Sequence, residues 1–344
     1  MSELEQAAAT QGAPPAEARR LPRTVRWLLE AQTAWIFLAL LGMIGVFAFL
    51  KPAEFATVDN FRNMAVDASS LLVIAVGMTF VIITGGIDLS VGAVLVFASI
   101  VAGKAMEAQG GNGYGTVLLG LAVALVAGLG WGLVNGIVIT RSRVTPLIVT
   151  LGTLGMAEGA GLLITDVNIR SVPLKLTDSI GIGRLWGQIP YLVLIAAFVT
   201  VVAAIALALT RFGRYTYAVG SNAEAARRVG VKTEQHLIKV YAISGMLAGL
   251  AGFLSLARFS TTTIGGHSTD NLQAIAAVVI GGTSLFGGIG TIVGSVVGVF
   301  IPVVLQNGFI ILSVQPYWQE VAVGAVLIAA VYLDQLKRRA RAQG

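Results

Sequence analysis

The chain has 344 residues, of which 56% are hydrophobic and 12% are charged, whereas a soluble domain carries about 25% charged residues. This composition excludes an ordinary soluble domain and predicts an all-α polytopic membrane protein. The absence of Cys excludes disulfides, thiolate metal sites and Cys nucleophiles. The net charge of +6 is explained by membrane topology, as the distribution below indicates, and not by binding to nucleic acid.

Residues 1–26 are rich in Ala, Gln, Glu and Pro and lack apolar periodicity, which predicts a disordered cytoplasmic tail. Four arginines, Arg19, Arg20, Arg23 and Arg26, precede the first apolar segment. A cleaved signal peptide is the alternative, but the apolar segment is long and has no convincing cleavage site. We therefore expect an uncleaved first span.

A transmembrane domain is predicted over residues 27–333, with a basic cytoplasmic tail at 334–344. About ten apolar segments approach the ~20 residues that a membrane span requires. They are residues 27–50, 64–83, 89–104, 114–140, 145–164, 191–210, 237–257, 272–283, 289–307 and 320–333. With both termini in the cytoplasm, most of the 23 Lys and Arg residues fall on the inner side. This distribution favours a multi-pass membrane protein in contact with lipid, with both termini in the cytoplasm.

The sequence TGGIDLSVGA (residues 84–93) interrupts the apolar pattern after the second segment. Gly85 and Gly86 let the backbone leave the helical region, and Asp88 then caps the next helix by accepting from N–H groups near Ser90 and Val91. The functional interpretation is a wall or gate of a permeation path, because broken helices at membrane depth line protein or water. An ordinary capped turn explains the pattern equally well.

A weakly similar glycine-rich stretch, GGTSLFGGIGT (residues 281–291), follows the eighth segment as TGGIDLSVGA follows the second. It contains Thr283 and Ser284. Two corresponding Gly-interrupted segments indicate a transporter built from two pseudo-repeats. The alternative is chance recurrence in a chain with 42 Gly residues. In this layout both breaks lie on the cytoplasmic side.

Two further polar residues inside apolar segments are pathway candidates. Glu158 lies deep in the fifth segment, and an ionisable residue at membrane depth is a functional suspect. It lines a cavity or is neutralised by a neighbouring helix. Asn135 either faces a pore or bonds a neighbouring helix, and the second arrangement is commoner.

The longest basic interruption, residues 211–235, contains a compact helix signal. Ser221 is the expected N-cap, Glu224 its capping-box partner, and Gly230 the C-terminal stop. A helix over residues 222–229 is too short to hold alone in water, so we interpret it as a docking helix. The predicted coupling residues are Ser221, Asn222, Glu224, Ala225, Ala226, Arg227, Arg228 and Gly230.

Several motifs of catalysis are missing from the sequence. It has no G-x-x-x-x-G-K-[ST] phosphate cradle, no G-x-S-x-G elbow and no H-E-x-x-H pair. The sequence therefore predicts no enzyme, no catalytic residue, no metal site and no cofactor bound by this chain.

Four stretches in combination, residues 84–93, 135–153, 217–231 and 276–299, resemble the ribose-type sugar ABC transporter permeases within the branched-chain amino acid and monosaccharide permease group. The resemblance runs from about residue 35 to 333. It implies a fold similar to the vitamin B12-type (type II) importers. It also implies a second permease copy or paralogue, ATPase subunits that bind ATP and Mg²⁺, and a soluble substrate-binding protein. Residues 221–230 match the loop that couples to the ATPase.

The resemblance specifies the family more sharply than the substrate. Family members often carry a basic residue where this chain has Glu158 before Gly159. A ribose-, xylose- or galactose-like monosaccharide is the expected cargo. The alternatives are an ABC permease for autoinducer-2, a nucleoside or a polyol, an ion-coupled secondary transporter, or a passive channel.

Overall fold

A computed structural model of the chain describes residues 32–165, 172–262, 267, 269–315 and the single positions 317, 318, 321, 322, 324, 325, 328, 329 and 332. The predicted tails, residues 1–26 and 334–344, lie outside the described residues. So does half of the tenth predicted segment.

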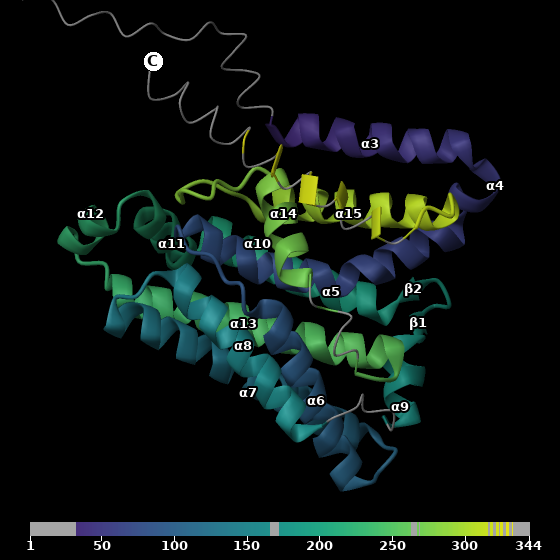
Figure 1. The fold of residues 1–344 in the computed structure, drawn as a ribbon, viewed down its shortest axis with the longest axis horizontal. Helices are drawn as coiled ribbons and strands as arrows, with labels where there is room; N and C mark the ends of the chain where they lie inside the picture. The colour runs from purple at the N-terminus through teal and green to yellow at the C-terminus, as the bar shows by residue number, and fades with distance from the viewer. Residues whose placement is uncertain are drawn as a thin grey trace, which may run out of the picture.

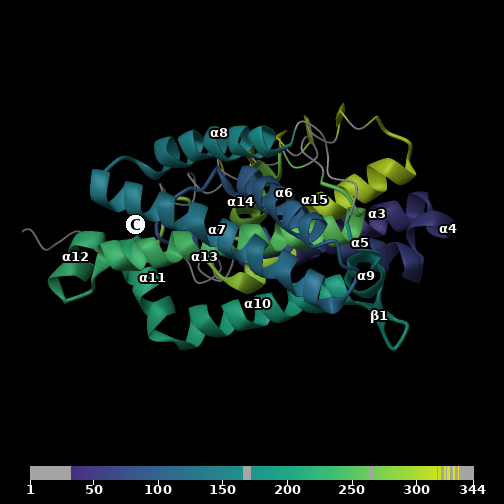
Figure 2. The same ribbon diagram turned by 90° about the horizontal axis from the view of Figure 1, so that it is seen from below.

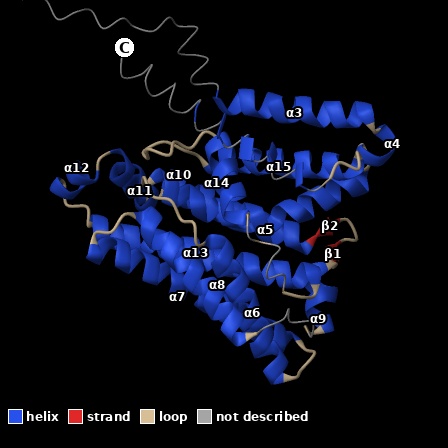
Figure 3. Ribbon diagram, in the orientation of Figure 1, coloured by secondary structure: helices blue, strands red, loops and turns tan. Residues whose placement is uncertain are grey.

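Helices make up nearly all the regular structure of the described residues (Figure 3). The strands there form one short antiparallel hairpin, β1 (Arg184–Leu185) with β2 (Ile189–Pro190). The helices are α3 (Gln32–Leu50), α4 (Pro52–Phe55), α5 (Val58–Ile83), α6 (Val91–Gln109), α7 (Tyr114–Ser142), α8 (Pro146–Ile164), α9 (Leu174–Leu176), the π-helical turn η1 (Thr177–Gly181), α10 (Tyr191–Leu209), α11 (Arg211–Ser221), α12 (Ala223–Arg228), α13 (Thr233–Phe259), α14 (Asp270–Ile280) and α15 (Ile292–Ile311).

Seven of the described helices, α5, α6, α7, α8, α10, α13 and α15, are long and apolar enough to cross a membrane. The apolar helices α3 and α14 are shorter in hydrophobic length. The first nine predicted segments each coincide with one of these helices, which confirms the all-α polytopic prediction. The second begins earlier than expected, at Val58, because Thr57 caps it by accepting from the Asn60 N–H at 3.1 Å.

The core of the molecule lies along α5 and α13, which run through the middle of the bundle (Figures 1 and 2). Within their most apolar stretches 89% and 83% of the residues are buried, whereas only 22% are buried in α10. A helix that is apolar all round is either enclosed by protein or faces lipid. Thus α5 and α13 form the protein interior, and α10 presents its apolar surface outward.

Glycines allow α7 and α13 to approach each other with their backbones in contact. A Cβ atom on Gly128 of α7 would overlap the carbonyl oxygen of Gly245 of α13, and one on Gly249 would overlap the carbonyl oxygen of Ala124. Small residues permit this close packing where helices associate in lipid. The many glycines of the chain therefore serve helix packing here, as the composition predicts.

The bundle has two distinct ends. The short helices α11 and α12 lie at one end, and α4 and the β1–β2 hairpin lie at the other (Figures 1 and 2). We call these the α12 end and the α4 end. Helix α13 begins beside α12 and runs for 27 residues toward the α4 end, which is about 40 Å at 1.5 Å per residue.

Candidate functional site

Helix α12 forms at the predicted place, but its first turn differs from the prediction. The N-cap is Asn222, whose side-chain oxygen accepts from the Ala225 N–H at 2.9 Å. Ser221 is instead the last residue of α11. The predicted Ser221 cap is therefore wrong by one residue, because α11 continues through Ser221 and leaves Asn222 as the extended residue between the two helices.

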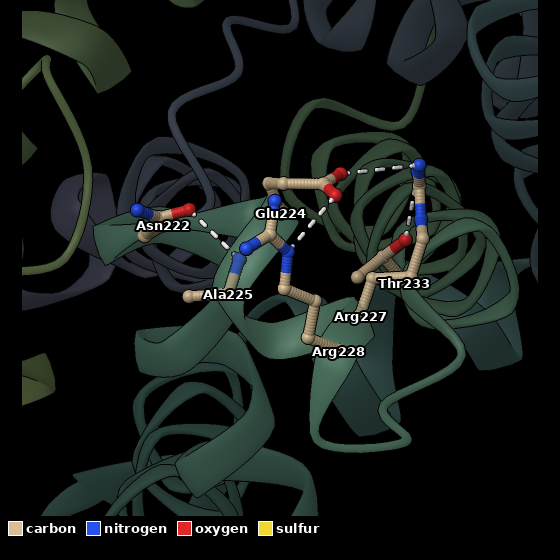
Figure 4. A network of polar contacts seen from close by, with 6 residues as sticks. All are labelled: Asn222, Glu224, Ala225, Arg227, Arg228 and Thr233. Carbon is tan, nitrogen blue, oxygen red and sulfur yellow. Dashed lines mark hydrogen bonds and ion pairs between the residues drawn. The ribbon is translucent and has the colours of Figure 1, made fainter.

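The same shift removes the predicted capping box. Glu224 becomes the second helical residue, whereas a capping box requires the acid at the third. Its carboxylate lies between Arg227 and Arg228, at 3.6 and 3.4 Å, and Arg227 also donates to the Thr233 hydroxyl at 3.4 Å (Figure 4). Exposed pairs of this kind stabilise a helix only slightly. Their effect is to hold the two guanidinium groups at the tip of the helix.

Helix α12 projects from the molecule. Only Ala226 is buried, with 4% of its surface exposed, while the apolar side chain of Val229 is 80% exposed. Gly230 follows with a φ of +89°, which confirms the predicted C-terminal stop because this left-handed conformation favours glycine. The helix thus presents two arginines and an unburied Val at the α12 end.

Helix α11 precedes α12 where the sequence predicts only a loop. Thr210 caps it by accepting from the Gly213 N–H at 3.3 Å. Its buried residues Gly213, Thr216 and Val219 recur at helical spacing. This spacing is the sequence signal that indicates α11. The signal is weak because Gly213 is small and Thr216 is polar.

The end of α11 is packed directly against backbone. A Cβ atom on Gly220 would overlap the carbonyl oxygen of Ile83, the last residue of α5. The Gly288 N–H donates to that same oxygen at 2.8 Å. Gly288 has a φ of +77°, and a Cβ on it would lie 2.6 Å from the Ser221 hydroxyl oxygen. Three backbone segments therefore meet with no side chain between them.

Gly288 belongs to one of the two glycine interruptions, and Ile83 immediately precedes the other. We call residues 84–90, between α5 and α6, the first break, and residues 281–291, between α14 and α15, the second break. Tyr217 of α11 donates to the Gly290 carbonyl in the second break at 2.7 Å. Burial raises the pKa of the Tyr217 phenol, so it remains a neutral donor at physiological pH. The helix that leads into α12 thus contacts the second break directly and meets α5 at Ile83, the residue before the first break.

The first break begins with Gly85 at a φ of +78° and contains a fully enclosed carboxylate. Asp88 is 1% exposed. One of its oxygens accepts from the Ser90 N–H at 3.0 Å and the Ser90 hydroxyl at 2.6 Å, and the other accepts from the Ser244 hydroxyl of α13 at 3.1 Å. The prediction that Asp88 accepts near Ser90 is confirmed, but α6 itself begins after Ser90 with no side-chain cap.

Asn135 continues this buried network. Its amide donates to the Ser90 hydroxyl at 2.8 Å, and its carbonyl oxygen accepts from the Thr153 hydroxyl of α8 at 2.6 Å. Asn135 is 1% exposed. Of the two predicted arrangements, the structure has the bond to neighbouring elements. The chain from Ser244 to Thr153 links α13, the first break, α7 and α8.

The second break has a different construction. Ser284 donates its N–H to the Ile289 carbonyl at 3.0 Å, which closes the loop. The Thr283 hydroxyl is buried, and it has no hydrogen-bond partner among the described residues. Gly282 and Gly287 both have positive φ values. Backbone contacts therefore maintain this break, whereas side-chain hydrogen bonds maintain the first.

Glu158 lies apart from both breaks. It is exposed on the outer surface of α8 and pairs with none of the described residues. Gly152, Gly155 and Gly159 of the same helix also face open space. The structure thus places Glu158 on an uncovered face of the bundle and does not bring it to the other pathway candidates.

The fold and the two breaks define a class of protein, a polytopic helical membrane protein with interrupted helices of the kind that transporters use. Residues 60–331 match the family described as "Branched-chain amino acid transport system / permease component". The chain belongs to this permease family.

Curated relatives match the chain over most of its length. The ribose import permease protein RbsC of Escherichia coli (strain K12) is 37% identical over 92% of this chain and 96% of its own length. The ribose import permease protein RbsC of Bacillus subtilis (strain 168) is 38% identical over 88% of this chain and 92% of its own. The galactose/methyl galactoside import permease protein MglC of E. coli (strain K12) is 34% identical over 88% of this chain and 94% of its own length. No solved structure matches the chain, so the likeness to vitamin B12-type importers stays a prediction.

Proposed function

We propose that this chain is the path-forming subunit of an ATP-driven importer for a monosaccharide, and that α12 is its contact with a separate ATPase subunit. The observation that carries the proposal is the direct backbone packing of α11 on the end of α5 and on the second break, because α11 runs straight into the exposed helix α12. The relatives named for ribose and galactose import support the choice of cargo.

The orientation follows from charge. The α12 end carries the basic residues Arg211, Arg214, Arg227 and Arg228. Cytoplasmic loops of membrane proteins carry an excess of Lys and Arg. The α12 end then faces the cytoplasm and the ATPase, both termini are cytoplasmic, and the α4 end receives sugar from a soluble binding protein outside a bacterial inner membrane.

A second permease copy or a paralogue completes the path. A carboxylate exposed to lipid in the interior of a membrane helix is costly, and Glu158 occupies such a position on α8. The cost disappears if α8 lines a watery path between two permease subunits. The open glycines of α8 allow another helix to approach closely.

The mechanism involves no covalent chemistry in this chain. ATP and Mg²⁺ bind to the partner ATPase, whose closure displaces α12 through Arg227, Arg228 and Val229. Because Gly220 abuts the Ile83 carbonyl, α11 cannot move without moving the ends of α5 and the second break. That displacement switches the path between outward and inward access.

The test reverses the charge of the α12 tip. Arg227→Glu with Arg228→Glu should lower ATP-dependent ribose uptake in proteoliposomes of the assembled transporter by at least about tenfold, since losing an interface charge pair costs about 2 kcal/mol or more. Arg141→Glu, an exposed reversal at the end of α7, is the matched control and should leave uptake unchanged. ATP hydrolysis is measured in parallel.

Two results would contradict the proposal. Normal uptake in the double variant would remove the case for α12. Uphill uptake by this chain alone, without an ATPase and abolished by an ionophore, would identify an ion-coupled secondary transporter instead.

A further inference from the structure

A partly open cavity of about 370 Å³, with both polar and apolar lining, lies toward the α4 end between α5, α13, α14 and α15. It is at the far end of α13 from α12, because its wall includes Arg258 and Phe259, the last residues of that helix. Pockets that hold small molecules begin at about 300 Å³. The polar lining side chains include Asp67, Arg258, Asp270, Gln273, Gln306 and Asn307.

The charged groups of this cavity are already paired with each other. Arg258 donates to Asp67 at 2.5 Å, and His267 and Asp270 are 2.7 Å apart. Asn307 exchanges two hydrogen bonds with Asn60, at 2.9 and 3.0 Å. A charged ligand would compete with these pairs for the same groups, which disfavours binding of a zwitterionic amino acid.

Other groups in the cavity remain available. The Gln306 amide and the Ser70 hydroxyl make no hydrogen bond with any described residue. They supply both donors and acceptors. Phe259 and Ile310, 53% and 61% exposed, provide apolar surface beside them. The cavity thus offers neutral polar groups and apolar walls together.

We propose that this cavity is a transient binding site for a neutral polyhydroxylated molecule of monosaccharide size. The hydroxyls of such a ligand can hydrogen-bond to the free Gln306 amide and to the accessible polar atoms of the ion pairs. Its carbon–hydrogen faces can pack against Phe259 and Ile310. The inference rests on the proposed function, since it makes the cavity the outer stage of sugar entry. It also selects a neutral sugar over the amino acids for which the family is named.

The test uses the absence of Cys from the chain. Ser70→Cys places a single thiol in the cavity, and a small maleimide labels it in proteoliposomes of the assembled transporter without ATP or binding protein. If the site holds ribose with a Kd of about 1 mM, ribose at about 10 mM should slow labelling about tenfold, because the rate follows the empty fraction. Galactose should protect similarly, and leucine should not.

Two matched variants sharpen the result. Ala108→Cys, at the exposed end of α6, should be labelled at a rate that no sugar changes. In the Ser70→Cys background, Gln306→Ala should raise the ribose concentration needed for protection, whereas Gln315→Ala, an exposed Gln beyond α15, should not.

The outcomes separate this inference from the proposed function. Failure of Ser70→Cys to label, equal protection by leucine, or protection that requires the binding protein would each overturn the cavity assignment while ATP-dependent uptake still stands. Protection of the thiol combined with ATP-independent uptake would retain the cavity and reject the proposed function.

Discussion

The two glycine breaks look alike in sequence but are built differently. The first encloses a carboxylate that receives hydrogen bonds from Ser90 and Ser244, with Asn135 and Thr153 continuing the network. The second contains an unpartnered hydroxyl at Thr283 among the described residues and is joined to α11 by contacts to backbone. The first break is therefore anchored to three helices, and the second follows α11.

This difference predicts which of the two breaks moves when α11 is displaced. A displacement of α12 would pass through Gly220 to the end of α5 and to the second break, but buried hydrogen bonds hold the first break in place. Removing such bonds leaves desolvated polar groups at substantial cost. Motion should therefore concentrate in the second break and α15. The following three changes break or sharpen this comparison, from the largest effect to the smallest.

The largest effect is expected from Gly220→Val. Its side chain would overlap the Ile83 carbonyl, which is backbone and cannot turn aside. Overpacking of this kind costs about 1–3 kcal/mol, and α11 must separate from the end of α5 and from the second break. We expect a lower thermal midpoint in detergent and loss of ATP-dependent uptake. Gly130→Val in α7, where a Cβ meets nothing within 4 Å, is the control. Equal losses of thermal stability and uptake in both variants would show that the contact between Gly220 and the Ile83 carbonyl has no special role.

Asp88→Ala should have the next largest effect. It leaves the Ser90 N–H and the Ser244 hydroxyl without their acceptor in a buried site, which costs about 1–3 kcal/mol. Asp88→Asn retains one carbonyl oxygen and should lose less stability. Thermal unfolding in detergent measures both. Asp59→Ala, which removes a carboxylate that is 83% exposed, should cost less than about 1 kcal/mol. An unchanged thermal midpoint in Asp88→Ala would mean that the network does not anchor the first break.

Thr283→Val should have the smallest effect. The Thr283 hydroxyl makes no hydrogen bond with the described residues although it is buried, so replacing it with a methyl group of similar shape removes an unpaired group at no cost. The matched change in the first network, Thr153→Val, removes a bond to Asn135 and should cost about 1 kcal/mol. The comparison fails if Thr283→Val is the more destabilising of the two in thermal unfolding.

Local signals were predicted well. The apolar segments, the stop at Gly230 and the departure from helix at Gly85 depend on residues adjacent in sequence, and all three appear in the structure. The N-cap of α12 was misplaced because Ser221 and Asn222 are both good caps. What decides between them is whether α11 extends through Ser221, and α11 is stabilised by packing that its own sequence signals weakly.

The remaining features required tertiary structure. The sequence allows Asn135 to face a pore or to bond a neighbouring helix, and although the second arrangement is commoner, only its position beside Ser90 and Thr153 establishes it. Asp67 and Arg258 are 191 positions apart in the chain, and no local pattern indicates that they meet in one cavity. The likeness of the two breaks likewise conceals that only the first contains an acid with partners.

The sequence by itself determined that this protein spans a membrane in many helices, where those helices break, and which end collects positive charge. These properties follow from the hydrophobicity of contiguous residues, the conformational freedom of glycine and the sign of side-chain charge. Only the tertiary structure decided that Gly220 packs α11 against the end of α5 and the second break, that Asp88 is enclosed by hydroxyl donors, and that a cavity with polar and apolar lining opens at the opposite end. Each of these depends on groups distant in sequence becoming neighbours, and the energy of a buried hydrogen bond or a backbone contact exists only once packing has brought them together.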